Sequence, residues 1–341
     1  MPYTIQINAR SSTPKYRQIA NSIIRGIESK IIGREEQLPS INELSSAYDI
    51  SRDTAEKAYR LLKKQGIVRS VRGKGYYTSS DSIATDRKIL LVFNKLSLYK
   101  EAIYNGFVKT INQKAWVDLQ IYYEDYSLFE RILKEKSGKF TEYVIIPSFK
   151  GEEAIKAQQA IDHHLVGQKI LLLNSTLPNL QEQYGAVVQN YEIDIYQALL
   201  KVHHQLSKYQ QIKMYFPFQS NYSRGIIHGF QKYCLEKQIN SDIIFKNYDQ
   251  EKLHAGTAYI LINDHQLVTL VNKIKHNKLT LGEQIGILAY NDSPLKQVLL
   301  DGITVMTTNH DKMGSIAANM IINNDWKKIE NEFHLIERGS L

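Results

Sequence analysis

Apolar side chains recur at helical spacing in two stretches near the start of the chain. Ahead of the first, Thr13-Pro14 suits a helix start, because threonine caps helices and proline is tolerated at the first helical position. The second stretch begins at Ser40, and Glu43 three residues later completes a capping box. The residues expected to face inward are Ile19, Ala20, Ile23, Ile24 and Ile27 in the first helix, and Leu44, Ala47 and Tyr48 in the second.

A third amphipathic helix follows, with Ser51 as its cap. Its inward face holds Ala55, Ala58, Tyr59 and Leu62, and its outward face holds Asp53, Lys57, Arg60 and Lys64. The pattern then changes to two short strand-like runs, 67–68 and 76–78, around the tip Gly73-Lys74-Gly75. Glycines at such a tip permit a positive φ and close backbone approach, so the sequence predicts a hairpin.

From residue 88 onward, short continuous apolar runs alternate with helical stretches. Such strands are typical of a parallel sheet covered on both faces by helices, so we expect an α/β fold. Two such units of about 130 residues each would form two lobes with a cleft between them. The expected strands are 89–93, 143–146, 170–173, 258–262 and 285–289, and the expected helices are 101–114, 152–166, 192–207, 224–237 and 265–277.

A polar segment without an apolar period separates these regions and is interpreted as a linker. The predicted domains are therefore residues 1–78, a linker at 79–87, and a two-lobed domain at 88–341. Residues 1–80 hold 14 Lys and Arg against 7 Asp and Glu, a net charge of +7, whereas the whole chain carries only +8. Positive charge confined to a small domain is the electrostatic footprint expected for phosphate contact.

The rest of the composition narrows the class of protein. Cys234 is the only cysteine, so an intrachain disulfide is impossible. No apolar run approaches the roughly 18 residues that span a bilayer, and the sequence does not open with a signal-peptide pattern. We expect a cytoplasmic protein without membrane contact.

The third helix and the hairpin together predict a surface for double-stranded DNA. A helix-turn-helix places the start of its second helix against base edges in the major groove. Arg52 and Lys57 can reach guanine edges or phosphates, and Thr54 can contact a base or the backbone. The hairpin adds phosphate-seeking charge from Arg69, Arg72 and Lys74. Its Gly-Lys-Gly tip lacks the spacing of a nucleotide phosphate loop or a dinucleotide-binding loop, so those alternatives are excluded.

This first domain closely resembles the winged helix-turn-helix of the GntR family of bacterial transcription factors. The matching segments are YRQIA at 16–20, LPS at 38–40, SRDT at 51–54, GIV at 66–68 and GKGY at 73–76. The resemblance implies a homodimer that binds a palindromic operator. One departure is Asn42, which stands where the family often has a DNA-contacting arginine. The predicted DNA-binding residues are Ser40, Asn42, Ser51, Arg52, Thr54, Lys57, Arg69, Arg72, Gly73 and Lys74.

The larger domain resembles the ligand-sensing domain of the lactose-repressor family, which is related to periplasmic sugar-binding proteins. The matching landmarks, in chain order, are 88–93, 106–107, 143–147, 229–230, 262–264, 285–292 and 307–317. The resemblance implies a two-lobed, periplasmic-binding-protein-like fold with the inducer between the lobes. The expected function is a ligand-responsive transcription regulator, a repressor of carbohydrate-utilisation genes, controlled by a sugar or sugar-derived effector.

The predicted ligand contacts are polar or aromatic residues near strand ends, because sugars need bidentate hydrogen bonds and an aromatic surface. Asn263, Asp264 and Asp292 fit the polar positions of the family, although Asp or Asn after a strand also serves as a turn former or helix cap. The chain departs from the family at two places. The family's arginine position is Ile226 here, with Arg224 two residues earlier, and a position where the family commonly has Asp is occupied by Gln189 and Asn190. An arginine-poor cleft favours an uncharged sugar. The remaining predicted contacts are Tyr99 and Phe149, and Lys100 and Glu101 are also expected in the cleft, all from strand-end loops.

No catalytic, cofactor or metal site is expected. The sequence has no Gly-x-Ser-x-Gly or His-Glu-x-x-His motif, and the histidine pairs at 163–164 and 203–204 lack the spacing of a helical metal site. Two alternatives stay open for the large domain. It could dimerise without binding an effector, or it could sense a purine or another non-sugar, since fold alone does not fix the ligand.

Overall fold

The computed structural model describes Ile5, Ile7 and residues 14–28, 31–33, 35–64, 66–71, 73–79, 87–177, 179–217, 221–246 and 248–341, with only the backbone at residue 113. The chain forms two compact units. One comprises Met1–Lys88 with Asn112–Trp116, and the other comprises Ile89–Ile111 with Val117–Leu341.

The smaller unit has helices packed beside a short antiparallel sheet of strand order β1-β3-β2. All the predicted helices of this region are confirmed, but the prediction that Ala47 is buried is wrong. The second helix ends there, and Ile50 beyond it fills the core instead. The elements are α1 (Lys15–Glu28), β1 (Gln37–Leu38), α2 (Ile41–Ala47), α3 (Arg52–Lys64), β2 (Val68–Val71) and β3 (Gly75–Thr78).

The ring of Tyr59 joins the third helix to the hairpin. Tyr59 is fully buried on α3, and its ring stacks on that of Tyr76 in β3 with centroids 4.2 Å apart and an interplanar angle of 5°. Its hydroxyl donates a hydrogen bond to the carbonyl of Pro39, ahead of α2. One side chain therefore fixes α3 against both the sheet and the start of α2.

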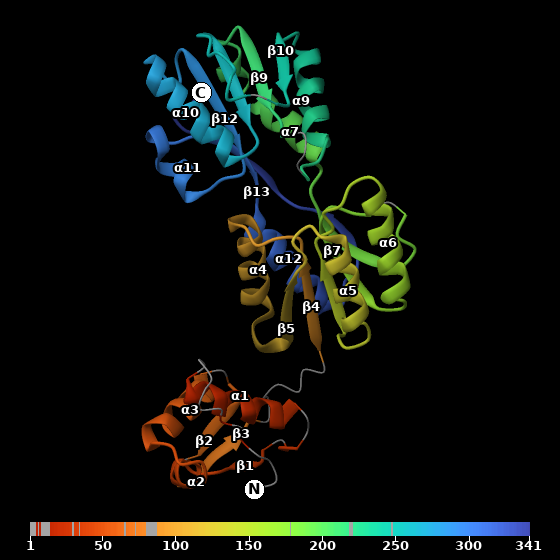
Figure 1. Cartoon of the computed structure of the whole chain (residues 1–341), viewed down its shortest axis with the longest axis vertical. Coiled ribbons are helices and arrows are strands. Elements are labelled where there is room, and N and C mark those ends of the chain that lie inside the picture. Colours follow the sequence, from red (N-terminus) through yellow and green to blue (C-terminus); the bar gives the residue numbers. More distant parts are fainter. Residues whose placement is uncertain are drawn as a thin grey trace. The chain divides into compact units, whose positions relative to one another are not determined.

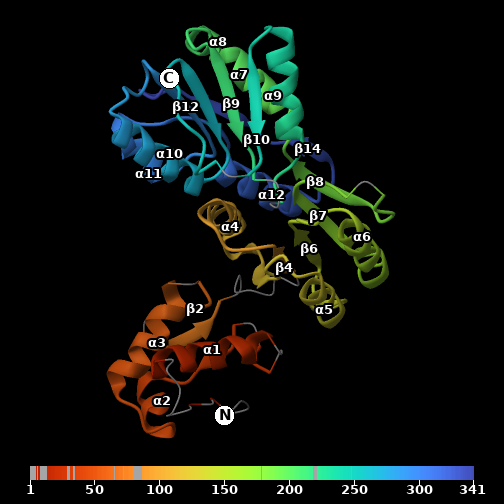
Figure 2. The same ribbon diagram turned by 45° about the horizontal axis from the view of Figure 1, so that its top comes forward.

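The larger unit has two lobes, each built on one sheet with helices on both faces (Figures 1 and 2). The first lobe has strand order β14-β8-β7-β6-β4-β5. Its elements are β4 (Lys88–Phe93), α4 (Leu98–Ile111), η1 (Asn112–Lys114), β5 (Trp116–Ile121), α5 (Tyr126–Lys136), β6 (Glu142–Ile145), α6 (Glu152–His164), β7 (Lys169–Asn174), β8 (Tyr184–Val188), α12 (His310–Asn323) and β14 (Lys328–Glu330).

The second lobe has strand order β10-β9-β11-β12-β13-β15, parallel throughout except for β15. Its elements are α7 (Tyr191–Lys201), α8 (His203–Leu206), β9 (Gln211–Tyr215), α9 (Gly225–Glu236), β10 (Ser241–Ile244), β11 (Thr257–Leu261), α10 (Asp264–Asn277), β12 (Ile285–Tyr290), α11 (Pro294–Val298), η2 (Leu299–Asp301), β13 (Thr304–Thr308) and β15 (Phe333–Ile336).

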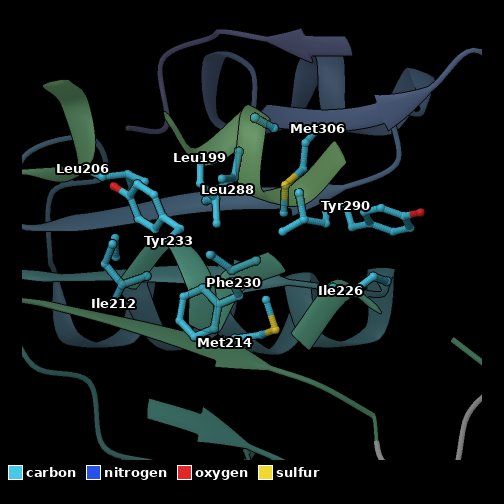
Figure 3. Packing of buried hydrophobic residues seen from close by; sticks show 14 of the residues in the cluster. Leu199, Leu206, Ile212, Met214, Ile226, Phe230, Tyr233, Leu288, Tyr290 and Met306 are labelled. Carbon is cyan, nitrogen blue, oxygen red and sulfur yellow. The ribbon is translucent and has the colours of Figure 1, made fainter. Parts of the chain in front are cut away.

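The inner strands, among them β4, β11 and β12, are buried on both faces, as their continuous apolar sequences predict. In β4, Leu90 and Val92 belong to the core beneath α5 and α6, so the alternate residues face the other layer of helices. In the second lobe, Figure 3 shows Met214 and Leu288 from the sheet packed with Phe230 and Leu199 from α9 and α7. Each lobe therefore has its own hydrophobic core.

Within the residues that the structure describes, the chain passes between the lobes three times: from β8 to α7, from β13 to α12, and from β14 to β15. The buried side chain of Asn331 ties these crossings together by donating to the Thr308 hydroxyl and the Asn309 carbonyl. Its backbone N–H bonds the carbonyl of Val188 at 2.7 Å. The crossings thus form one hydrogen-bonded hinge.

Candidate nucleic-acid interface and ligand cavity

Serine side chains set the start of both helices in the predicted DNA-reading region. The Ser40 hydroxyl accepts the N–H of Glu43 at 3.2 Å, and the Glu43 carboxylate accepts the N–H of Ser40 at 2.7 Å. Hydrogen bonding of the Glu43 carboxylate to Ser40, first to its backbone N–H and then to its side chain, lowers the pKa of Glu43. At α3, the Ser51 hydroxyl accepts the N–H of Thr54 at 3.2 Å. Both serines thus act as caps, whether or not they also contact DNA.

The outward face of α3 carries exposed charges in helical pairs. Lys57 lies 2.6 Å from Asp53, and Arg60 lies 2.8 Å from Glu56. Exposed pairs four residues apart contribute only about 0.3–0.5 kcal/mol, so a phosphate can displace the carboxylate at little cost. Two further predicted DNA contacts are also exposed: Arg52 at the start of α3 and Asn42 at the start of α2.

A groove of about 700 Å³ runs between α1 and α3. Sequence analysis did not identify the contribution of α1 to this surface, which includes Lys15. Spacing within one helix cannot show which other helix lies beside it. The groove is lined by Pro14, Lys15, Tyr16, Thr54, Lys57, Arg60, Leu61 and Lys64.

The hairpin presents an exposed tip. Gly73 and Gly75 have φ of 77° and 101°, values that side-chain-bearing residues adopt with strain. Lys74 between them is exposed, and its carbonyl accepts a hydrogen bond from Gln37 of β1 at 2.8 Å. Arg69 lies over the ring of Tyr77 and 3.7 Å from Glu35. The predicted contact Arg72 lies outside the described residues.

Between the two lobes lies a cavity of about 220 Å³. Its walls come from loops and helix starts that follow the carboxyl ends of strands in both sheets, the usual position for ligands in α/β folds. The lining residues are Asn94, Lys95, Ser97, Tyr99, Lys100, Glu124, Ser148, Asn174, Gln189, Tyr191, Asn221, Tyr222, Tyr290, Asn291 and His310.

A second cavity of about 830 Å³ adjoins the first. Phe149, Asn190 and Arg224 line it, together with Lys150 and Glu330. Six residues line both cavities, so the two are parts of one cleft. The shared residues are Ser148, Asn174, Gln189, Tyr191, Asn221 and Tyr222.

Aromatic rings give the smaller cavity flat apolar surfaces. Tyr99 stacks on His310 with centroids 5.2 Å apart, and Tyr222 meets Tyr290 edge to face at 6.2 Å. Burial, the largest cause in each case, raises the pKa of Tyr99, Tyr222 and Tyr290, so their hydroxyls stay protonated. Such rings suit the apolar face of a sugar ring, while their hydroxyls can donate hydrogen bonds.

Two residues that line this cavity each have a buried acceptor atom with no hydrogen-bond partner among the described residues: Asn94 Oδ1 and His310 Nδ1. Asn94 uses its amide N–H to reach Glu124 at 3.1 Å. His310 Nε2 lies 3.3 Å from Asn291 Oδ1, an acceptor, so Nε2 carries the proton and Nδ1 is left to accept. Burial and then Lys100 lower the pKa of His310 to about 3, which keeps the ring neutral. A ligand with hydroxyl groups would satisfy both acceptors.

One predicted residue forms a direct bridge between the lobes. The side-chain amide of Gln189, just after β8, lies 3.0 Å from the hydroxyl of Tyr290 at the end of β12. Both side chains are buried, and both line the smaller cavity. Tyr99 is the other predicted ligand contact that lines this cavity.

Three predicted contacts lie outside both cavities, and their side chains hold the fold together. The side-chain oxygen Oδ1 of Asn263 accepts the backbone N–H of Gln266 at 2.9 Å, in a capping box that starts α10. Asp264 pairs at 2.8 Å with the buried ammonium of Lys296. Asn263 thus serves as a helix cap and Asp264 as an ion-pair partner, roles that do not require a ligand.

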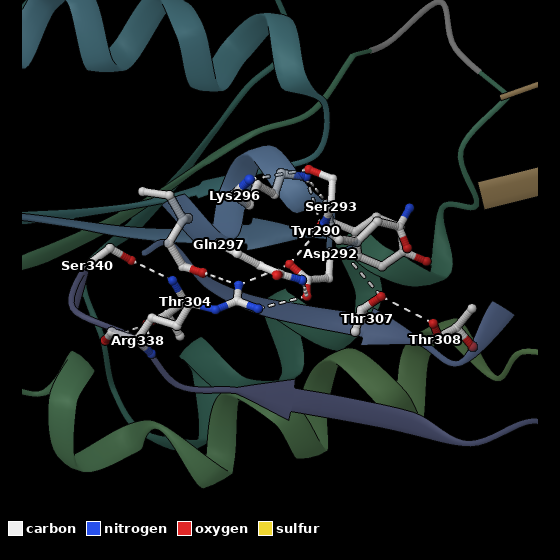
Figure 4. Close-up of polar contacts among 12 residues, drawn as sticks. Tyr290, Asp292, Ser293, Lys296, Gln297, Thr304, Thr307, Thr308, Arg338 and Ser340 are labelled. Carbon is white, nitrogen blue, oxygen red and sulfur yellow. Dashed lines mark hydrogen bonds and ion pairs between the residues drawn. The ribbon is translucent and has the colours of Figure 1, made fainter. Parts of the chain in front are cut away.

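Asp292 is held by an arginine that sequence analysis did not single out. The Arg338 guanidinium donates to both carboxylate oxygens of Asp292, at 3.0 and 2.7 Å (Figure 4). Burial acts to raise the pKa of Asp292, but the hydrogen bonds and charge of Arg338 outweigh it and lower that pKa. Asp292 lines a further surface pocket, which shares Tyr99 and His310 with the smaller cavity.

Sequence reasoning missed several residues that line the smaller cavity, among them Asn94, Asn174 and Asn291. Each stands at or just after the end of a strand, and Asn174 and Asn291 have positive φ, which asparagine tolerates better than most residues. Asparagine at a strand end was therefore the available signal. No local sequence signal identified the other three, Tyr191, Tyr222 and His310. They reach the cavity because distant parts of the chain meet at the cleft.

Comparisons with known proteins agree with this architecture. Residues 15–77 match the family described as bacterial regulatory proteins, gntR family. The HTH-type transcriptional repressor YtrA of Bacillus subtilis (strain 168) is 35% identical over 99 residues, which cover 29% of this chain and 72% of YtrA. The HTH-type transcriptional regulator TreR of the same organism is 39% identical over 61 residues, 18% of this chain and 26% of TreR.

Solved structures of transcription regulators resemble the chain. The lac repressor dimer bound to operator and the anti-inducer ONPF has a TM-score of 0.60 at 16% identity, covering 74% of this chain and 93% of the repressor. A LacI-family regulator from Enterococcus faecium with bound ribose has a TM-score of 0.59 at 15% identity, covering 74% and 98%. At these identities the likeness establishes the fold.

Among the described residues, no helix is both long and apolar enough to cross a membrane, and no group of three or more His, Cys, Asp or Glu is placed to hold a metal ion. The match of the helix-turn-helix region, and above all the relation to YtrA, determine the family. The chain belongs to the GntR family of bacterial regulatory proteins, and its larger unit has the fold of the lactose-repressor type.

Proposed function

We propose that this transcription regulator is a homodimeric repressor of carbohydrate-utilisation genes whose operator binding is controlled by a sugar or sugar-derived effector. Residues 1–78 bind DNA, 79–87 form the linker, and 88–341 bind the effector and dimerise. No cofactor is needed. The observation that carries the proposal is the small cavity lined from both lobes, with aromatic walls and two unsatisfied acceptors.

The recognition of DNA rests on α3 and the hairpin. Arg52 and Thr54, at the exposed start of α3, read base edges, and Lys57 and Lys74 contact phosphates. A dimer reads a palindromic operator only if its two helices are spaced to match half-sites, about 34 Å or a multiple of it apart. A modest change in the spacing of the two DNA-binding domains therefore weakens binding.

The effector acts by favouring one arrangement of the lobes. A ligand that contacts Tyr99 and Asn94 in one lobe and Tyr222 and Tyr290 in the other stabilises the arrangement in which all four are within reach. Switching occupancy from about 1% to 99% requires a preference of about 5.5 kcal/mol for that state. Names of similar proteins support the ligand class: one solved structure is the CelR–cellobiose complex, and another holds ribose.

A thermal-shift screen of the full chain tests this function. The panel contains neutral monosaccharides and disaccharides, sugar acids, sugar phosphates, nucleosides and purines. We expect one chemically related group of sugars to raise Tm by mass action. The operator is then isolated by selection from random duplexes, and the hit is titrated against the complex. If only purines raise Tm, the proposed effector is a purine and not a sugar. If no compound raises Tm, the larger domain is better explained as a dimerisation domain without an effector.

A further inference from the structure

Lys100, in the first turn of α4, is a cation inside the proposed effector cavity. Among the described residues, its ammonium forms no ion pair, whereas neighbouring Lys95 pairs with Glu124 at 3.2 Å. Burial and then Lys95 lower the pKa of Lys100 to about 8, with Glu124 opposing, so the group is still mostly protonated at neutral pH. A partly buried cation without an anion is costly to keep in a fold.

The charges around the cavity leave a positive excess. Its lining has two lysines, Lys95 and Lys100, and one carboxylate, Glu124, so the formal balance is two minus one, or +1, with His310 neutral. The carboxylate of Glu124 is already held by Lys95 and by the amide of Asn94. The nearby carboxylates of Asp264 and Asp292 are paired with Lys296 and Arg338. Lys100 is therefore the charge left to a ligand.

The remaining polar atoms specify the rest of that ligand. Asn94 Oδ1 and His310 Nδ1 are acceptors that need donors, and hydroxyl groups supply them. The rings of Tyr99 and Tyr222 offer flat surfaces. The part of the cleft around Lys100 has a volume of about 220 Å³, which is room for one sugar ring.

We propose that the effector is a sugar acid, a polyhydroxylated monocarboxylate whose carboxylate pairs with the Lys100 ammonium while its hydroxyls donate to Asn94 and His310. This inference rests on the proposed function of the cavity. It differs from the uncharged sugar that an arginine-poor sequence favoured, because the charge is supplied by a lysine on α4. A single unpaired ammonium matches a monoanion better than a phosphate dianion, which needs more donors.

The test uses the full chain and matched pairs of compounds. Glucose is compared with glucuronate and gluconate, and galactose with galacturonate, by calorimetry and thermal shift; glucose 6-phosphate forms a third arm. Lys100→Met removes the charge at nearly constant length, and Lys100→Arg keeps it. The control is Lys109→Met, which makes the same change at an exposed position of the same helix, outside the cavity.

We expect at least one acid to bind and its neutral partner to bind at least about tenfold more weakly, the worth of a charge-assisted hydrogen bond. Lys100→Met should abolish this preference, Lys100→Arg should keep part of it, and Lys109→Met should leave it intact. Without any ligand, Lys100→Met should raise Tm, because the uncompensated cation is gone; a fall in Tm would show that Lys100 has a structural partner and would overturn the proposal.

The outcomes separate this inference from the proposed function. Equal binding of acids and neutral sugars, or an acid preference that survives in Lys100→Met, overturns the sugar-acid inference and leaves the sugar sensor standing. Binding of glucose 6-phosphate but of no carboxylate overturns it in favour of a sugar phosphate. If neither series binds and the wider screen also yields nothing, both fail.

Discussion

The Gln189 side-chain amide and the Tyr290 hydroxyl meet at 3.0 Å, joining the end of β8 in one lobe to the end of β12 in the other. The hydroxyl also lies 3.2 Å from the Gln189 carbonyl oxygen. The contact is buried beside the cavity, so it biases the arrangement of the lobes before any effector binds.

Removing either partner should therefore destabilise the free protein. Tyr290→Phe removes this hydrogen bond while the Gln189 side chain keeps its bond to Asp194, so we expect a loss of about 0.5–1.5 kcal/mol in the free energy of unfolding. Gln189→Ala should cost a similar amount, and the double variant less than the sum. Urea unfolding of all four proteins gives this cycle directly; strictly additive losses would mean that the two groups do not interact.

The contact between α4 and α12 depends on two glycines. A Cβ added at Gly314 would lie 2.0 Å from the carbonyl oxygen of Ile103, and one at Gly106 would lie 2.2 Å from that of Asp311. Gly314→Ala should thus destabilise the protein by about 1–3 kcal/mol, even though alanine is the better helix former. Asn319→Ala, on the exposed face of the same helix, is the control and should be neutral or slightly stabilising. Thermal unfolding distinguishes them.

The hinge should respond to pH through Asp194, in the first turn of α7. Burial and then Glu330 raise the pKa of Asp194 to about 6 from 3.8, while the backbone N–H bond at Asn190 and the side chain of Gln189 oppose the shift. Because the folded-state pKa is raised, the stability contributed by the protonated carboxyl is complete below pH 3.8 and is lost as the pH rises through about 6.

Asp194→Asn keeps a neutral side chain at every pH. The gain in Tm of this variant over the parent should be larger at pH 8 than at pH 5. Asp249→Asn, at an exposed position of the same lobe, should show no such trend. An equal gain at both pH values would contradict the ionisation of Asp194 as the cause.

Lys74 at the hairpin tip should act on DNA through charge alone. Lys74→Ala should weaken binding similarly for operator and non-operator duplexes and reduce the slope of log K against log salt by about 0.9, the value for one lost phosphate contact. Fluorescence anisotropy between 50 and 200 mM salt measures the slope. Lys139→Ala, at an exposed position of the larger unit, serves as a control; an unchanged slope in Lys74→Ala would remove the tip from the interface.

Asp292 should matter for stability and little for effector affinity. Asp292→Asn breaks the bidentate pair and leaves the Arg338 guanidinium, 16% exposed, without its counter-charge. We expect a drop in Tm, with the Kd of any effector changed by less than about threefold, well below the tenfold that a charged contact is worth. A selective loss of affinity at unchanged Tm would return Asp292 to the ligand site.

The sequence predicted those features that depend on local spacing. The cap at Ser40, the faces of α3 and the continuous apolar strands are all visible in short windows, and all are confirmed. Asp292 shows the limit of such reasoning. The sequence predicts it as a ligand contact because it stands at a strand end and fits a polar position of the family. Its partner Arg338 stands 46 positions away, and no local pattern indicates that this arginine pairs with it.

Short sequence windows also fail to identify most residues that line the cavity. Tyr222, Tyr290 and His310 come from separate loops that meet only because the strand order brings their ends together. The sequence predicts Lys100 as a cleft residue, and it lines the smaller cavity, but its lack of an ion pair among the described residues depends on the folded surroundings. The family resemblance predicts a ligand cleft between the lobes, and both cavities lie there. Asn263, Asp264 and Asp292 lie outside both cavities and take part in a helix cap or an ion pair.

The first lobe is assembled from segments made far apart in time on the ribosome. Its helix α4 packs on α12, and the Ser315 hydroxyl reaches the carbonyl of Gly106 across 209 residues of sequence. While the intervening second lobe is being synthesised, the apolar face of α4 has no partner. Neither lobe can therefore be completed until the C-terminal segments emerge, α12 and β14 for the first lobe and β15 for the second.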